Sequence, residues 1–206
     1  MIDSQVIAFF FVASVLAITP GADTLLVMKN SMRFGSAAGW ATTFGILGGT
    51  LMHALISALG ISVILAQSET LFQLVKAFGA LYLVWLGIQA LRCSGHAPPD
   101  APSGKHTAVR GAFLEGLITN ILNPKVAIFY IAFLPQFIDA SDPVLAKSLL
   151  LASIHNGLSL LWLGALVTII ARGSTWMQRP HIQKRLSHIS GAILIALGLR
   201  LALESR

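Results

Sequence analysis

The stretch Thr19-Pro20-Gly21-Ala22-Asp23 interrupts an otherwise apolar run that extends from Val6 to Met28. A proline inside a helix costs about 3 kcal/mol, and an aspartate at the centre of a bilayer costs roughly 2.5–3.5 kcal/mol. Apolar sequence on both sides indicates a membrane span, so the break and the charge both need an explanation. Broken helices at membrane depth are tolerated where the freed backbone groups are buried in protein or line a cavity.

Composition also indicates an integral membrane protein. Hydrophobic residues make up 55% of the 206 residues and charged residues 11%, whereas an average soluble domain carries about 25% charged residues. The net charge of +6 does not indicate a nucleic-acid partner, because the basic residues lie between apolar segments and form no run interleaved with aromatics. Cys93 is the single cysteine, which excludes an internal disulfide and a cysteine metal cage.

Six apolar segments are long enough to cross about 30 Å of hydrocarbon at 1.5 Å per residue. They cover residues 5–28, 38–66, 70–91, 111–138, 144–171 and 186–203. The first, third and fifth connections between them are basic, whereas the second and fourth are acidic or nearly neutral. The positive-inside rule therefore predicts that the basic connections face the cytoplasm and that both termini are non-cytoplasmic. The first segment lacks a preceding positive region, so we expect it to be retained and not cleaved as a signal peptide.

The third connection is the one stretch that resembles a linker, since residues 94–107 include Pro98, Pro99 and Pro102. It divides a single membrane domain into a first three-helix repeat, residues 1–93, and a second, residues 108–206. Three is an odd number of spans, so the second half enters the membrane in the opposite sense. The predicted fold is all-α, with six transmembrane helices in two inverted three-helix repeats and with helices 1 and 4 broken.

The two halves carry similar features at matching places. Thr19-Pro20 interrupts the first span and Asn123-Pro124 interrupts the fourth, while His53 in the second span matches His155 in the fifth. Glycines also match between the third and sixth spans, although glycines in membrane helices often align by chance. These similarities favour an internal duplication.

Thr or Asn followed by Pro is typical of a helix N-cap and first turn, because proline lacks an N–H that would be unpaired there. Each broken span is thus predicted to contain a second half-helix that begins inside the membrane and presents free N–H groups to a carboxylate. Proline kinks used only for packing are the alternative. Two matched breaks with adjacent charges, Asp23 and Lys125, favour a binding site.

Asp23 is predicted to exchange protons or to bind a substrate ammonium, and Lys125 to pair with Asp23 or with a substrate carboxylate. The alternatives are that the two residues only pair with each other, or that Asp23 complements the helix dipole. His53 and His155 are candidates for a proton relay or a polar lining, with hydrogen-bonded packing as the alternative. The predicted substrate- and proton-binding residues are Thr19, Pro20, Gly21, Asp23, Asn123, Pro124, Lys125, His53 and His155.

Two further features concern packing. Ala41, Gly45 and Gly49 recur at four-residue intervals on one face of the second span, which predicts close contact with another helix. Glu115 lies about one turn beyond Arg110, and we expect it to pair locally near the membrane surface.

Several motifs together resemble the LysE/RhtB family of bacterial amino-acid exporters: Thr19-Pro20-Gly21-Ala22-Asp23, Asn30-Ser31 with Gly35, Gly79 to Gly87, Asn123-Pro124-Lys125 and Leu134-Pro135-Gln136-Phe137. The resemblance covers the whole chain in the same motif order, and one departure is Ala22, where the family usually has a second proline. It implies a secondary transporter of the inner membrane that exports amino acids or their derivatives, coupled to protons. The partners expected are that small-molecule substrate, protons and the lipid bilayer, and a homo-oligomer remains open.

No enzyme is expected, and no cofactor or resident metal. The sequence has no Ser-His-Asp order with a nucleophile elbow and no phosphate-binding glycine loop. The alternative function is export of a divalent metal ion, with Asp23, His53 and His155 as ligands. Against it, Asp23 and Glu115 are the only carboxylates in or near the predicted spans.

Overall fold

The computed structural model describes residues 4–67, 108–139, 141–173 and 179–203, together with individual residues between 74 and 92. Within these residues all regular secondary structure is helical and there is no strand. The predicted linker, 94–107, and much of the predicted third span, 70–91, lie outside the described residues. The six-helix inverted repeat therefore stays a prediction.

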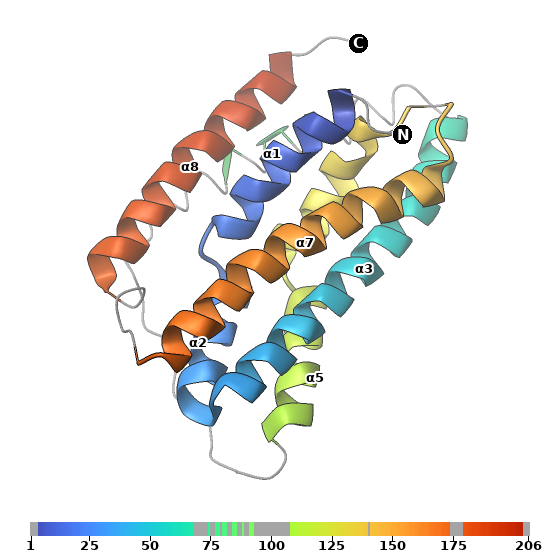
Figure 1. Cartoon of the computed structure of the whole chain (residues 1–206). Helices are drawn as coiled ribbons and strands as arrows, with labels where there is room; N and C mark the ends of the chain where they lie inside the picture. The colour runs from blue at the N-terminus through green and yellow to red at the C-terminus, as the bar shows by residue number, and fades with distance from the viewer. Residues whose placement is uncertain are drawn as a thin grey trace.

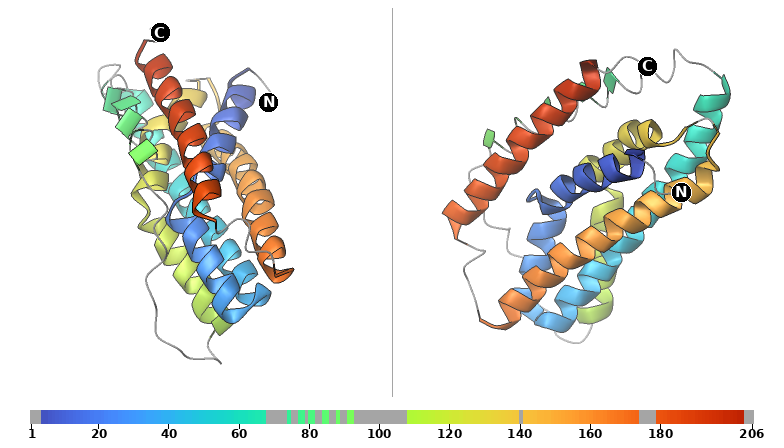
Figure 2. Two further views of the ribbon diagram at one scale, coloured as in Figure 1. Left: turned by 90° about the vertical axis from the view of Figure 1, so that its left-hand side faces the viewer. Right: turned by 45° about the horizontal axis from the view of Figure 1, so that its top comes forward.

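Three helices are continuous and long: α3 (Ser36–Gln67), α7 (Val144–Ala171) and α8 (Pro180–Leu203). Helices α3 and α7 run side by side, and α8 lies at the edge of the bundle beside α1 (Figures 1 and 2). Both α3, over Ser36–Gly60, and α7 are long and apolar enough to cross a membrane. Their bounds agree with the second and fifth predicted spans.

The first and fourth predicted spans are broken, as the sequence indicates. Helices α1 (Ser4–Ile18) and α2 (Ala22–Phe34) meet at 50°. In the fourth span, Val109–Ile121 of helix α5 (Ala108–Ile121) and Pro124–Phe137 meet at 49°. Each bent pair is long and apolar enough for one span, so the described residues contain two to four candidate spans.

The second part of the fourth span changes its winding twice. It begins as α6 (Pro124–Ile128), continues as a π-helix, η1 (Phe129–Phe133), and ends as a 3₁₀-helix, η2 (Leu134–Phe137). Short π-helical turns of this kind occur frequently at functional sites.

Helices α3 and α5 pack closely through glycine, as the glycine spacing in the second span predicts. A Cβ atom at Gly45 would lie 2.1 Å from the carbonyl oxygen of Phe113, and one at Gly116 would lie 2.3 Å from that of Thr42. Neither distance leaves room for a side chain. The outer surface is apolar, with Leu59 and Leu161 each 73% exposed, which suits contact with lipid.

Candidate functional site

The first break joins α1 to α2. The backbone N–H and the hydroxyl of Thr19 both donate to the carbonyl oxygen of Val15, at 3.0 and 2.6 Å, and Pro20 has no N–H to extend the helix further. Helix α2 begins after Gly21, which provides no side-chain cap. The prediction that Thr19 caps the second half-helix is therefore wrong, because its hydroxyl bonds back to the helix before the break.

The second break has the predicted local chemistry. Asn123 is the N-cap of α6, and its Oδ1 accepts a hydrogen bond from the backbone N–H of Lys125 at 3.0 Å. Pro124 occupies the first turn, where its missing N–H costs nothing. Pro124 is exposed.

Lys125, in the second half of the chain, binds backbone groups at the first break. Its ammonium donates to the carbonyl oxygens of Leu16 and Thr19, at 2.8 and 2.9 Å. Carbonyls at the C-terminal end of a helix have no intrahelical partner, and a cation is also favoured there by the helix dipole. The second half of the chain thus supplies the cap that the first break lacks.

Asp23 makes the reciprocal contact. It lies in the first turn of α2, where its Oδ2 accepts from the side-chain amide of Asn120 at 2.8 Å and its Oδ1 from that of Asn123 at 3.2 Å. Asp23 and Lys125, both in the described part of the chain, form no ion pair. Each charge is held by neutral groups of the other half.

A small cavity lies between the two breaks. Its polar lining consists of Thr19, Gly21, Asp23, Thr24, Thr50, Asn120, Asn123, Lys125, His155 and Ser159. The cavity has a volume of about 30 Å³. This is enough for two or three water molecules, at about 10–15 Å³ each. An amino acid does not fit this space, so binding one requires the cavity to widen.

The structure brings most of the predicted site residues together at this cavity, while three of them lie off it. Pro20 lies within the first break, and Pro124 is exposed; neither lines the cavity. His53 does not line the cavity but contacts Asn120, which does: its Nε2 lies 3.0 Å from the carbonyl oxygen of Asn120.

Sequence reasoning missed Thr24, which directly follows Asp23, and also Asn120, Thr50 and Ser159. Each of the last three lies about one helical turn from a predicted residue: Asn120 before Asn123, Thr50 before His53 and Ser159 after His155. Residues three or four apart share a helix face, so polar residues at these offsets were the available signal.

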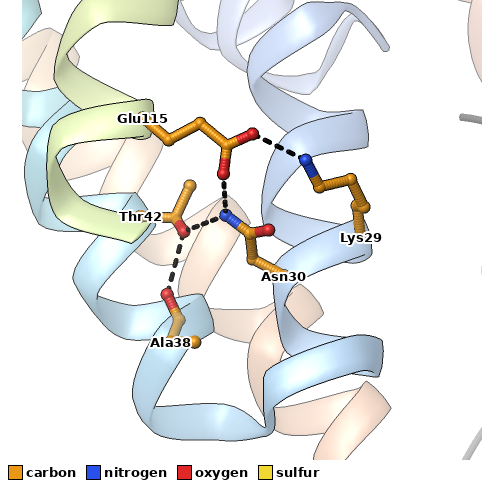
Figure 3. Close-up of polar contacts among 5 residues, drawn as sticks. All are labelled: Lys29, Asn30, Ala38, Thr42 and Glu115. Carbon is orange, nitrogen blue, oxygen red and sulfur yellow. Dashed lines mark hydrogen bonds and ion pairs between the residues drawn. The ribbon is translucent and has the colours of Figure 1, made fainter. Parts of the chain in front are cut away.

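A second polar cluster joins α2, α3 and α5 (Figure 3). Glu115 accepts from the ammonium of Lys29 at 2.6 Å and from the amide of Asn30 at 3.0 Å. The same amide donates to the hydroxyl of Thr42 at 2.9 Å. Glu115 therefore binds residues of the opposite half, and the expected local pairing near Arg110 is wrong.

The described residues contain no group of three or more His, Cys, Asp or Glu side chains that could hold a metal ion. Within that part of the chain, the geometry gives no support to metal export.

An apolar helical bundle with two broken helices around a buried polar cavity has the architecture of a membrane transporter. The chain belongs to the family of LysE type translocators, whose family model matches residues 14–205. Members of this family are transporters and not enzymes.

Curated relatives match over nearly the full length. The membrane protein YrhP of Bacillus subtilis is 34% identical over 97% of this chain and 99% of its own. The homoserine/homoserine lactone efflux proteins of Salmonella typhi and Salmonella typhimurium are each 29% identical over 95% of this chain and 94% of their own. No solved structure shows significant similarity to the chain.

Proposed function

We propose that this protein exports amino acids or their derivatives across the bacterial inner membrane by proton-coupled alternating access. The substrate binds between the helix breaks at Pro20 and Pro124, in a bundle of six spans built as two inverted repeats with both termini outside the cytoplasm. One observation carries this proposal: Asp23 and Lys125, residues of opposite charge, line the same cavity without forming a direct ion pair.

Separated opposite charges suit a zwitterion. The carboxylate of Asp23 can bind the substrate ammonium. Lys125 has three N–H donors, of which two bind the carbonyls of Leu16 and Thr19, so the third is left for the substrate carboxylate. The names of the two Salmonella relatives favour homoserine or a similarly small polar amino acid as the first substrate to test.

Export requires the cavity to widen and then to release its contents. The cluster of Lys29, Asn30 and Glu115 connects α2 to α5 (Figure 3), and Lys29 belongs to the basic connection predicted to face the cytoplasm. Entry from that side therefore requires this cluster to separate. Protonation of Asp23 from the outer side then weakens its hold on the substrate ammonium.

The membrane potential supplies enough energy for this function. One elementary charge moved across 100 mV provides about 2.3 kcal/mol, which supports a substrate gradient of about 50-fold at 1.4 kcal/mol per factor of ten. A pH gradient adds to it.

Counterflow of labelled L-homoserine in reconstituted vesicles, with and without a pH gradient, tests the proposal directly. We expect uptake by the wild-type protein that the gradient stimulates, and none by Asp23→Asn at the same amount of inserted protein. Asp142→Asn removes a carboxylate that pairs with Lys147 away from the cavity, and at the same amount of inserted protein it should keep the counterflow that the pH gradient stimulates.

Growth assays distinguish the substrate class. Cells that overproduce the protein are challenged in parallel with toxic amino-acid analogues and with divalent metal salts. Protection against the analogues supports the proposal, whereas protection against metals alone, or full counterflow by Asp23→Asn, contradicts it.

A further inference from the structure

Tyr130 is completely buried between two histidines. Its ring is 0% exposed and lies stacked with those of His53 on α3 and His155 on α7, with centroids 6.1 and 5.9 Å apart and planes inclined by 21° and 22°. The phenol oxygen is 3.1 Å from Nδ1 of His155. The two histidines that occupy matching places in the sequence are thus connected by one tyrosine.

The backbone of Tyr130 is also fixed from α3. Its carbonyl oxygen, which lies within the π-helix η1, accepts a hydrogen bond from the hydroxyl of Ser57. Ser57 and His53 are four residues apart and share one face of α3. Helix α3 therefore holds both the main chain and the ring of this tyrosine.

Hydrogen-bond requirements determine which group donates between Tyr130 and His155. No other described residue lies within hydrogen-bond distance of the phenol oxygen, and a buried O–H without an acceptor is costly. The phenol therefore donates and Nδ1 accepts. An imidazole that accepts at Nδ1 carries its proton on Nε2.

The two histidines differ in what their second nitrogen can do. Nε2 of His53 must donate to the carbonyl oxygen of Asn120, because a carbonyl only accepts. His155 is 4% exposed and lines the cavity, and among the described residues none accepts a hydrogen bond from its Nε2. The Nε2–H of His53 is therefore used in a hydrogen bond within the protein, while the Nε2–H of His155 is available to a molecule in the cavity.

We propose that Tyr130 is a positioning residue that keeps the proton of His155 on Nε2, and that this N–H donates to a carboxylate or ester carbonyl oxygen of the substrate. The inference rests on the proposed function, since it adds a third substrate contact to Asp23 and Lys125. His155 recognises the oxygen end of the substrate together with Lys125, while Asp23 recognises the ammonium end.

Tyr130→Phe is the test, because it keeps the stacked ring and removes only the donor. In ¹⁵N-histidine NMR spectra of the protein in nanodiscs, with the His155 signals assigned from His155→Gln, the wild type should show a protonated Nε2 and an accepting Nδ1. Tyr130→Phe should give a mixture of both tautomers and raise the KM for L-homoserine about three- to tenfold, the range expected for one hydrogen bond. The maximal rate should change little.

Phe129→Leu is the matched control. Phe129 also contacts the His155 ring, with centroids 5.7 Å apart, but offers no hydrogen bond. The Phe129→Leu variant should therefore leave the tautomer of His155 unchanged.

The outcomes separate the inference from the proposed function. Adding L-homoserine to the wild type should shift the His155 Nε2 signal, and an unshifted signal would refute the substrate contact even where counterflow is normal. Unaltered tautomers in Tyr130→Phe would refute the positioning role. If that variant fails to fold, a wild-type His155 protonated on Nδ1 refutes it equally. Absence of counterflow in the wild type, by contrast, defeats the proposed function and leaves the tautomer assignment in place.

Discussion

The two helix breaks bend the chain by nearly the same angle, 50° and 49°, but their local chemistry differs. The second break is capped by its own Asn123. The first has no side-chain cap on α2, and the carbonyls at the end of α1 that lack an intrahelical partner are bound by Lys125 from the second break. Asp23 in turn binds amides of the opposite half. The two breaks are therefore parts of one structural unit, in which the second break has its own cap and the first is completed by a residue of the second.

The largest expected effect comes from removing the cap that crosses between the breaks. Lys125→Met keeps a chain of similar length and leaves the carbonyls of Leu16 and Thr19 without their partner, at about 1–3 kcal/mol each. Equilibrium unfolding in mixed detergent micelles should show this loss, and counterflow should be lost with it. Lys29→Met, which removes a partly exposed ammonium, should cost at most about 1 kcal/mol. Equal stability of the two variants would mean that the first break needs no partner.

A loss of intermediate size is expected from changes in α3 at its contact with Asn120, which lies just before the second break. A Cβ at Gly49 would lie 2.6 Å from Oδ1 of Asn120, whereas one at Gly48 meets only Leu117, at 3.4 Å. Gly49→Ala should therefore cost about 1–3 kcal/mol from overpacking, and it should reduce transport because Asn120 holds Asp23. Gly48→Ala should not lower the free energy of unfolding, because alanine favours a helix interior over glycine by up to about 1 kcal/mol, and it should leave counterflow unchanged. Indistinguishable variants would show that α3 does not position Asn120.

The smallest effects compare the two N-caps directly. Asn123→Ala removes a side-chain cap and an amide donor to Asp23, for a loss of about 0.5–2 kcal/mol. Gly21→Ala should stay within about 0.5 kcal/mol of the wild type, because φ is −164° and the new Cβ would meet Lys125 Nζ at an ordinary 3.7 Å. The same unfolding titration measures both. A larger loss at Gly21 than at Asn123 would reverse the comparison.

Much of the fold follows from local patterns in the sequence. The apolar segments predicted the bounds of α3 and α7, and Pro20 and Pro124 predicted both breaks. The spacing of Gly45 and Gly49 predicted that α3 contacts another helix closely, and the structure identifies that helix as α5. These features depend on residues close together in the chain, where hydrophobic periodicity and the special chemistry of proline and glycine act directly.

The cross-connections of the site could not be predicted in this way. Lys125 caps a helix whose end lies more than a hundred residues away in the sequence. Asn120 and Asp23, which are hydrogen-bonded, are also about a hundred residues apart in the sequence. Spacing within one helix gives no information on such pairings. The prediction that Thr19 caps α2 failed for a different reason. A hydroxyl before proline can cap the following helix or bond back to the preceding one, and tertiary packing decides between the two.

The bonds from Lys125 to the end of α1 have a mechanical consequence. They join the two halves of the chain beside the cavity. Under the alternating access proposed above, this junction would be the point about which the outer ends of the helices move, so that widening the gap on one face would narrow it on the other. The pathway would then never be open at both faces at once, and the membrane would stay sealed to protons while the substrate passes.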